Sequence, residues 1–352
     1  MYINNSRMVA WQQCYRYYAL RYILGLEPKI GSDALAFGSA SHDWAGAYYQ
    51  GILAGTPANR DDLHQTFETS YRHHGNPTYI DEFETNLAMG HRLIDDYLDR
   101  DYILDDFAPV QVESQFTCKI GDHCYKCGAR YEPLDNAEVC VSCGSPVFHL
   151  VGRADLIVTR QNRLVVLDHK TAKGVGKLTM DGWSHCFGLI GYAYGVDRTT
   201  DFHVTQFGVN IIKKLKTVGK DTKVCPSCRN GKRKKLTCLE CQASGYVPMD
   251  PVKAFYRDYF RVTAHDFKML EHNRIRLSTD IVKEKEVYKA TPDLSYPMNC
   301  KSCEKFSGCD FRDVCWQGDD EGEWWNIPAT TLANFNVRDD DYVDDLVKEE
   351  LE

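Results

Sequence analysis

Two carboxylates and a lysine occupy positions from which they can share one small surface. Asp155 opens a short apolar run, Asp168 ends a second one, and Lys170 follows two residues later. Residues i and i+2 of a strand share a face, so Asp168 and Lys170 are expected to point the same way. Carboxylate oxygens bind hard cations such as Mg²⁺ or Mn²⁺, and a nearby ammonium can orient an anionic oxygen or an attacking water. The alternative is a surface hairpin with a solvated Asp–Lys pair.

The element that must position these groups is a predicted β-hairpin. Residues 156–159 and 164–167 are two runs dominated by leucine, isoleucine and valine. The polar stretch 160–163 between them is a turn signal. Such a hairpin folds the first carboxylate back toward the second carboxylate and the lysine.

The stretch GRADLIV, followed by LVVLDHKT, resembles the core of the PD-(D/E)XK nucleases, and most closely their RecB-like branch. That branch includes the AddB nuclease domain and the exonucleases of CRISPR adaptation. The resemblance implies an α/β, restriction-endonuclease-like fold with a mixed central sheet flanked by helices. It also implies that Asp155, Asp168 and the backbone carbonyl of His169 bind Mg²⁺ or Mn²⁺. Lys170 would position the attacking water or stabilise the pentavalent phosphate.

Two further residues match motifs that these nucleases carry around the metal. A helix is predicted within residues 36–51, after Gly38 and Ser39, and the resemblance makes its His42 a metal ligand. A capping or core histidine is the alternative. A strand predicted at 110–117 contains Glu113, where the family often has another acidic residue near the metal.

A predicted helix at 183–196 both matches and departs from the family pattern. The resembling nucleases have a glutamine and a tyrosine on this helix, with the glutamine near the substrate strand. Tyr192 matches the tyrosine, but Gly188 stands in place of the glutamine. Either another residue, such as His185, takes that role or the substrate is positioned differently.

Fifteen cysteines are a high count for 352 residues. The first ten residues have no signal-peptide pattern, so the repeated C-x-x-C spacing predicts metal binding and not disulfides. Two double knuckles are each expected to bind a structural Zn²⁺ through four thiolates, as zinc-ribbon insertions at 118–148 and 220–248. Their cysteines are Cys124, Cys127, Cys140 and Cys143 in the first ribbon, and Cys225, Cys228, Cys238 and Cys241 in the second.

Another set of cysteines lies toward the end of the chain, and Cys14 lies in a helix predicted at residues 6–26. RecB-like nucleases with an iron–sulfur cluster take one ligand from such an N-terminal helix and three from a C-terminal set. The resemblance therefore implies a [4Fe-4S] cluster that staples the two ends together. A third zinc site without Cys14 is the alternative. The C-terminal candidates are Cys300, Cys303, Cys309 and Cys315, of which the first three and the last three both suit a cluster.

Composition describes an ordinary folded protein with segregated charge. Apolar residues make up 43% of the chain and charged residues 26%, and no apolar run is long enough for a membrane span. The net charge of −8 is concentrated in an acidic tail within 318–352, whereas basic clusters lie at 213–220 and 232–235. These patterns predict a cytoplasmic protein with a nuclease domain at 1–317 and a local phosphate-binding surface.

The function expected from these features is metal-dependent hydrolysis of DNA phosphodiester bonds. The resemblance implies an exonuclease acting on single strands or free ends, in recombination, repair or end processing, and the motifs would suit a bacteriophage enzyme. A catalytically silent nucleic-acid-binding or assembly module on the same scaffold is the alternative. A third possibility is a metal-stabilised adaptor, with protein partners bound by Trp324 and Trp325 or by the acidic tail.

Overall fold

The protein is described from a computed structural model that places most of the chain. The described residues are 1–29, 32–75, 80–99, 105–131, 137–175, 182–201, 203–214, 222–224, 246–248, 254–292, 295–303, 309–317, 327 and 329–337.

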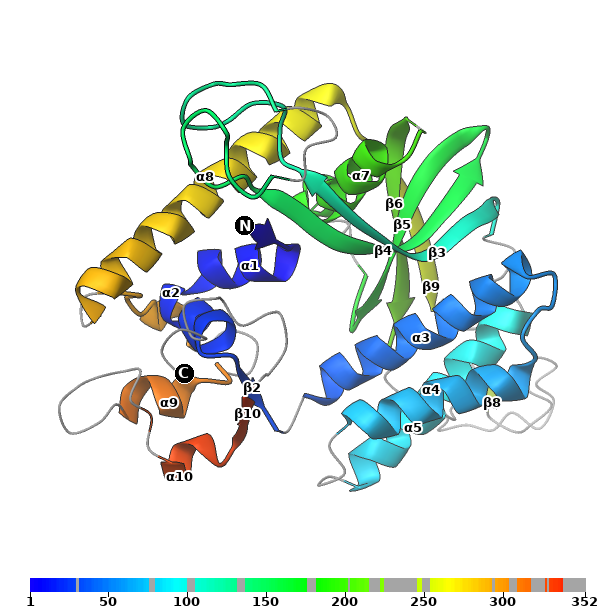
Figure 1. The fold of residues 1–352 in the computed structure, drawn as a ribbon. Coiled ribbons are helices and arrows are strands. Elements are labelled where there is room, and N and C mark those ends of the chain that lie inside the picture. The colour runs from blue at the N-terminus through cyan, green and yellow to red at the C-terminus, as the bar shows by residue number, and fades with distance from the viewer. Residues whose placement is uncertain are drawn as a thin grey trace.

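A mixed six-stranded sheet lies at the centre of the fold (Figure 1). Its strands are β1 (Tyr2–Ile3), β3 (Ala108–Lys119), β4 (His149–Arg160), β5 (Arg163–Ala172), β6 (Val204–Lys213) and β9 (Phe255–Arg261). Strand β4 pairs antiparallel with β3 and β5 and parallel with the short β1. Strand β6 is parallel to β5 and antiparallel to β9. The expected α/β fold with a mixed central sheet is therefore confirmed.

Helices flank this sheet and connect it to the segments near the two ends of the chain. They are α1 (Asn5–Gln13), α2 (Tyr15–Tyr18), α3 (Asp33–Leu53), α4 (Arg60–His74), α5 (Ile80–Asp99), α7 (Phe187–Thr199), α8 (Ala264–Ala290), α9 (Arg312–Gln317) and α10 (Ala329–Leu332). A π-helical turn at Ala19–Ile23 follows α2. Helices α4 and α5 share a hydrophobic core with α3.

The predicted β-hairpin is formed by β4 and β5. Leu156 pairs with Leu167, and the register continues to the pair Arg160 and Arg163. The turn contains only two residues, with φ angles of 49° at Gln161 and 60° at Asn162. Two left-handed residues in succession match the right-handed twist of the paired strands. The turn is therefore shorter than the four-residue stretch that the sequence suggested.

Helix α3 and helix α7 cover opposite faces of the hairpin. Val166 belongs to the core shared with α7, whereas Val165 and Leu167 pack in a cluster with the α3 face. Side chains alternate along a strand, so Asp168 continues the α7 face and His169 continues the α3 face. The end of β5 thus places polar groups on both sides of the sheet.

Three predicted helix boundaries are wrong. The helix expected at 6–26 is interrupted at Cys14, where the backbone is extended (φ −166°, ψ 124°) and the thiol accepts a hydrogen bond from a distant segment. Helix α3 begins at Asp33, capped by the side chain of Ser32, so Gly38 and Ser39 lie inside it. Helix α7 begins only at Phe187, four residues later than expected.

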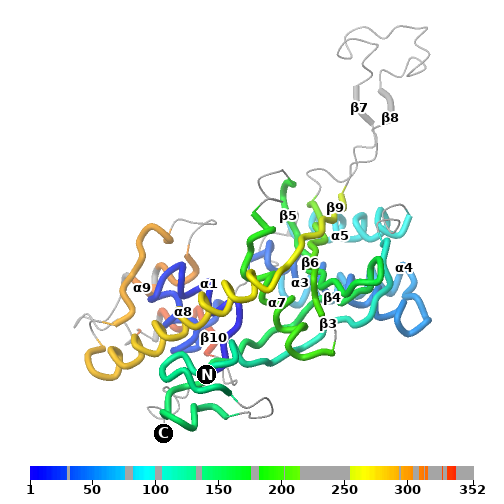
Figure 2. The backbone as a smooth tube through the Cα atoms, turned by 90° about the horizontal axis from the view of Figure 1, so that it is seen from above, coloured from blue at the N-terminus to red at the C-terminus, as the bar shows by residue number. Residues whose placement is uncertain are grey.

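The segments near the two ends of the chain lie together beside the sheet (Figure 1). Strand β2 (Leu26–Pro28) pairs antiparallel with β10 (Phe335–Val337), and Arg16 donates to the carbonyl of Tyr296 at 2.9 Å. Helix α8 reaches from the sheet to this region (Figure 2), and its 27 residues span about 40 Å. The two ends are therefore joined by backbone and side-chain contacts of their own.

We expect Gly195→Ala to destabilise the fold. The ring of Phe116 in β3 lies so close to α7 that a Cβ at Gly195 would come within 2.1 Å of it. Forcing a methyl group into a packed core costs about 1–3 kcal/mol. Gly191→Ala, in the same helix, is the matched control, because its Cβ would meet Asn5 at an ordinary 3.5 Å. Urea unfolding followed by circular dichroism should separate the two variants; equal midpoints would mean that α7 does not pack this closely.

Candidate active site

The candidate site lies where β4 and β5 separate. The backbone pairing of these strands ends at Leu156 and Leu167. One residue further on, the Oδ2 atom of Asp155 accepts the backbone N–H of His169 at 2.7 Å, so a side chain replaces the missing ladder partner. Asp155 and Asp168 are both buried, with 9% and 2% of their surface exposed. The structure therefore brings the two predicted carboxylates to one place inside the protein.

His42 of α3 contacts the first of these carboxylates. Its Nδ1 atom lies 3.2 Å from Oδ2 of Asp155. Burial lowers the pKa of His42, but the hydrogen bond and charge of Asp155 raise it above its ordinary value. Burial likewise raises the pKa of Asp155, while the contacts with His42 and with the backbone of His169 lower it to about 2. Asp155 is therefore ionised, and its carboxylate contacts the imidazole of His42 and the backbone N–H of His169.

Asp168 pairs with Lys170 across one face of β5, as the i and i+2 spacing predicted. The Nζ atom of Lys170 lies 2.7 Å from Oδ1 and 2.6 Å from Oδ2 of Asp168. Burial raises the pKa of Asp168 to about 6, with Lys170 opposing the shift. Burial lowers the pKa of Lys170, and Asp168 more than offsets this by raising it. Burial also lowers the pKa of the intervening His169 to about 3, so its ring is neutral.

Glu113 adds a third acidic group at the edge of this site. Its backbone adopts φ 52° inside β3, a left-handed conformation that non-glycine residues rarely take in a strand. Its Oε2 atom pairs with Nε of Arg153 at 2.6 Å. Burial, and then the charge of Asp155, raise the pKa of Glu113 against the opposing effect of Arg153. Carboxylates that repel one another in a buried place are suited to a shared cation.

The candidate metal-binding atoms of His42, Asp155 and Asp168 do not surround a single point in this structure. Among the described residues, only four knuckle cysteines form a group whose ligand atoms all lie within 4.8 Å of one another. His42 and Asp155 are in contact, but the carboxylate of Asp168 is occupied by Lys170. The donor set of an imidazole and two buried carboxylates nevertheless suits Mn²⁺ or Mg²⁺.

Tyr192 of α7 lies near the same charged groups, on the face of the sheet to which Asp168 belongs. Burial, followed by the charge of Asp168, raises the pKa of Tyr192. Four residues before it, the carbonyl of Gly188 accepts a hydrogen bond from Nδ2 of Asn5 at 2.9 Å, and a Cβ at Gly188 would lie 3.5 Å from that nitrogen. The amide of Asn5 therefore lies beside the position left empty by the glycine. His185 is exposed in the turn before α7.

Sequence reasoning did not identify Asn5. Its contacts depend on helix α1 packing against α7, and no local pattern marks them. Arg274 of α8 also donates to Oδ1 of Asn5, which fixes the orientation of the amide. Asn210 was missed as well, although a polar residue within the apolar end of β6 is a readable signal. Arg257 lies among other charged residues in β9, so no such signal marks it.

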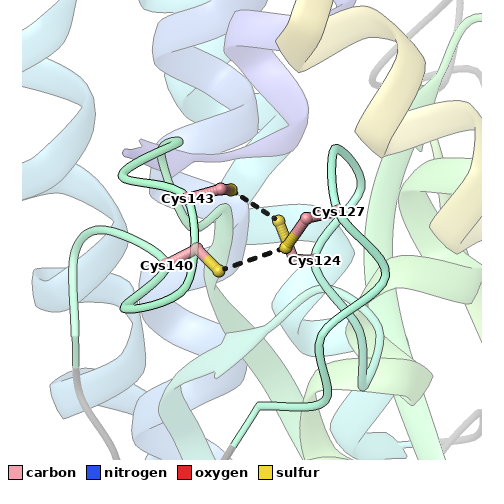
Figure 3. Close-up of side chains that lie close together, drawn as sticks. All are labelled: Cys124, Cys127, Cys140 and Cys143. Atoms are coloured by element: carbon pink, nitrogen blue, oxygen red, sulfur yellow. Dashed lines mark hydrogen bonds between the residues drawn. The ribbon is translucent and has the colours of Figure 1, made fainter.

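The first double knuckle brings its four cysteines face to face (Figure 3). The Sγ atoms of Cys124 and Cys143 lie 3.7 Å apart, as do those of Cys127 and Cys140. Four thiolates about 2.3 Å from one ion at tetrahedral angles would be about 3.8 Å apart. The glycine after each pair, Gly128 (φ 74°) and Gly144 (φ 70°), closes its knuckle as predicted. This group can hold a metal ion.

The surroundings of Cys124 and Cys143 lower the pKa values of these two thiols, whereas the pKa of Cys127 is raised by the neighbouring thiols. Ser145 lies 3.2 Å from Sγ of Cys124 and 3.0 Å from Sγ of Cys143. Burial raises the pKa of Cys124, but Ser145 and backbone amides lower it to about 5. The knuckle precedes β4 in the chain. The first residue of β4, His149, lies six residues before Asp155, which is about 20 Å along the strand. That separation suits a structural role.

Four cysteines from the two ends of the chain line one small cavity. They are Cys14, Cys303, Cys309 and Cys315. Cys300 is exposed and does not line it. Burial lowers the pKa of Arg16, which is 8% exposed, and the nearby Cys315 and Cys14 oppose this shift only in part. A buried cation beside four thiols suits an anionic thiolate cluster.

Several predicted features lie outside the described residues. They are the second double knuckle (Cys225, Cys228, Cys238 and Cys241), the basic residues 215–220 and 232–235, the pair Trp324 and Trp325, and the acidic tail from residue 338. Within the part of the chain that is described, no helix is long and apolar enough to cross a membrane.

Comparison with known proteins gives one clear match. A family model described as "PD-(D/E)XK nuclease superfamily" matches residues 3–316. No curated protein matches the chain. A solved structure titled "Crystal structure of SSO0001" is 11% identical and covers 76% of this chain and 84% of its own, with a TM-score of 0.26. The family match includes every residue of the candidate site.

Proposed function

Because the chain belongs to the PD-(D/E)XK nuclease superfamily, we propose that it hydrolyses phosphodiester bonds in DNA at the site formed by Asp155, Asp168 and Lys170. The observation that carries this proposal is the meeting of two buried carboxylates, a lysine and His42 where β4 and β5 separate. A structural hairpin would not need such a costly group of charges in its interior.

A divalent cation fits this place better than any other cofactor. We propose that His42, Asp155, Asp168 and the backbone carbonyl of His169 hold Mg²⁺ or Mn²⁺. Such a cation supplies Lewis acidity and lowers the pKa of a water bound to it. The charge of Asp155 raises the pKa of the half-buried Glu113 carboxyl, and a cation bound between the two would relieve this repulsion.

The remaining groups would act on the substrate. Lys170 keeps 39% of its side chain exposed and can leave Asp168 to contact a phosphate oxygen or the attacking water. Tyr192 lies beside the same carboxylate with its hydroxyl protonated, because burial and Asp168 raise its pKa. It can therefore donate a hydrogen bond to the DNA backbone. The amide of Asn5, held beside Gly188, would supply the polar contact that a glutamine at that position makes in the resembling nucleases.

We further propose the finer assignments that the resemblance implies. The enzyme would be an exonuclease of the RecB-like branch that acts on single strands or free ends during recombination, repair or end processing. Zn²⁺ would fill the knuckle of Cys124, Cys127, Cys140 and Cys143 and the second knuckle. A [4Fe-4S] cluster would be held by Cys14, Cys303, Cys309 and Cys315, the set that lines one cavity.

The experiment that tests this function is a cleavage assay on end-labelled single- and double-stranded DNA. Anaerobically purified protein is expected to shorten the DNA with Mn²⁺ or Mg²⁺ and to leave it intact with EDTA. Zinc and iron contents measured on the same sample show that the protein is metal-replete. A replete protein that binds the DNA but cleaves neither form with either cation would contradict the proposal and support a silent binding module.

A further inference from the structure

A row of buried polar side chains crosses the sheet beside the candidate site. His169 of β5 is the register partner of Asn210 of β6, and Asn210 is the partner of Arg257 of β9. The exposed fractions are 2% for His169 and 3% for Asn210, and 3% for the side chain of Arg257. Register partners on neighbouring strands lie on the same face of a sheet, so the three side chains meet in one layer beneath α3.

The row is connected by hydrogen bonds from end to end. Nη1 of Arg257 donates to Oδ1 of Asp105 at 2.9 Å. Its Nη2 atom donates to Oδ1 of Asn210 at 3.2 Å. Nδ2 of Asn210 lies 3.0 Å from Nδ1 of His169. Tyr97 donates to the same oxygen of Asp105 at 2.7 Å, which fixes the far end of the row.

These contacts determine where the proton of His169 is. A guanidinium can only donate, so the oxygen of the Asn210 amide must face Arg257 and its NH₂ group must face His169. That NH₂ group donates to Nδ1, so the proton of the neutral imidazole is on Nε2. Nε2 itself is buried and has no hydrogen-bond partner within the described parts of the chain. The ring stacks on Tyr49 at 5.8 Å and lies nearly perpendicular to the ring of His42 at 6.0 Å.

His169 links this row directly to the candidate metal ligands. Its backbone N–H is the group that Asp155 accepts, and it stands between Asp168 and Lys170 in the chain. Its ring contacts that of His42. Movement of the His169 ring would therefore shift the strand segment and the helix residue that surround the cation site. A buried ion pair is weak evidence for stability, since apolar residues of similar size often serve a fold better.

We propose that Asn210 and Arg257 are positioning residues, which hold His169 in its Nε2–H tautomer and thereby keep Asp155, Asp168 and His42 in register for a divalent cation. This inference rests on the proposed function for the cation, but the tautomer can be measured without any cleavage. The partners that orient a metal site usually change metal affinity or activity by roughly 10-fold to 100-fold when they are altered.

The test is Asn210→Asp, which keeps the shape of the side chain but removes the donor. Nitrogen-15 NMR of histidine-labelled protein is expected to show Nδ1 of His169 without a proton in the wild type and with a proton in Asn210→Asp. The signal of His169 is assigned from its absence in His169→Gln. Mn²⁺ affinity, measured by calorimetry, is expected to fall by roughly 10-fold or more. Gln206→Glu makes the same chemical change in the same strand at a partly exposed position and should change neither quantity.

A second variant protects the test against a simple loss of folding. Arg257→Lys retains the charge beside Asp105 but cannot reach both Asp105 and Asn210 with a planar fork. Because the Asn210 amide is then no longer oriented, both tautomers of His169 should appear and Mn²⁺ binding should weaken, but by less than in Asn210→Asp. The inference is overturned if Asn210→Asp is folded and binds Mn²⁺ as the wild type does, or if Nδ1 of His169 is already protonated in the wild type. A wild type that binds Mn²⁺ but does not cleave DNA would contradict the proposed function alone.

Discussion

Asp168→Asn is expected to abolish DNA cleavage while leaving the chain folded. The change removes the charge of a proposed metal ligand but keeps the size of a side chain that is 2% exposed. The loss should be on the order of 10³-fold in kcat/KM, equivalent to about 4 kcal/mol of barrier, because charge building on the phosphate is no longer balanced. Lys170 loses its partner but keeps 39% of its side chain in contact with solvent, so it can hydrate. Cleavage of end-labelled DNA under single-turnover conditions measures the effect.

The matched control for this variant is Asp106→Asn. Asp106 is also an ion-paired aspartate, and its partner Arg160 lies at the turn of the hairpin. Asp106 is exposed, however, and the turn is at the opposite end of the hairpin from Asp155 and Asp168. It should retain the cleavage rate of the wild type. If both variants cleave normally, the reacting phosphate does not lie at Asp168, and the assignment of the site is wrong even if the protein is a nuclease.

Asp168→Asn is also expected to change how the free energy of unfolding of the metal-free protein depends on pH. The pKa of Asp168 is raised to about 6 by burial, so the folded chain binds a proton that the unfolded chain releases near pH 4. The stability that this proton provides is present at low pH and is lost as the pH rises through about 6. Asp168→Asn should remove this contribution, so the difference in unfolding free energy between variant and wild type should grow in favour of the variant from pH 4 to pH 7.

Local sequence patterns were enough to predict the elements that hold the two carboxylates. The hairpin follows from two β-branched and leucine-rich runs around a polar turn, and the i and i+2 spacing places Asp168 beside Lys170. The knuckle glycines Gly128 and Gly144 are left-handed because only that conformation closes a C-x-x-C turn so tightly. These features depend on a few neighbouring residues, which is why they are readable without a structure.

The features that could not be predicted depend on partners far away in the chain. Cys14 interrupts a helical pattern because its extended backbone turns the thiol toward Asn299, whose N–H donates to it at 3.3 Å. The contact of Asn5 with Gly188 requires α1 to pack on α7, and the alignment of Asn210 with Arg257 is a matter of strand register. No local propensity encodes such contacts. Tertiary contacts therefore interrupt the helix at Cys14, although the local sequence favours a continuous helix at residues 6–26.

Hydrogen bonds already clamp the N-terminal segment to the region around Cys300. Asn299 and Ser302 both donate to the carbonyl of Gln13 at 2.8 Å. The backbone therefore presents Cys14 to the C-terminal cysteines before any cluster is considered. A cluster would then act on ends that are already close together, so its loss should loosen this region without unfolding the central sheet.

Cys14→Ser is expected to remove iron from the protein, whereas Cys300→Ser is expected to retain it. Cys14 lines the shared cavity together with Cys303, Cys309 and Cys315, and it lies near the buried cation of Arg16. Cys300 is exposed and does not line that cavity. Burial raises the pKa of Cys315 to about 12, so this thiol needs a strong electrophile such as iron to lose its proton at neutral pH. Iron content and visible absorbance of anaerobically purified protein measure the outcome.

Each variant removes one thiol, so the two together show whether the ligands of the cluster include Cys14 and whether they include Cys300. Iron retained in Cys14→Ser but lost in Cys300→Ser would show that the cluster uses the C-terminal cysteines in another way. A colourless wild type with zinc in this region would show a third zinc site instead. With a cluster present, Cys14→Ser should also unfold at lower temperature than Cys300→Ser, since ligation of iron by both ends stabilises only the folded chain. The cysteine that no helix pattern explains would then be the residue that ties the nuclease core to its C-terminal region.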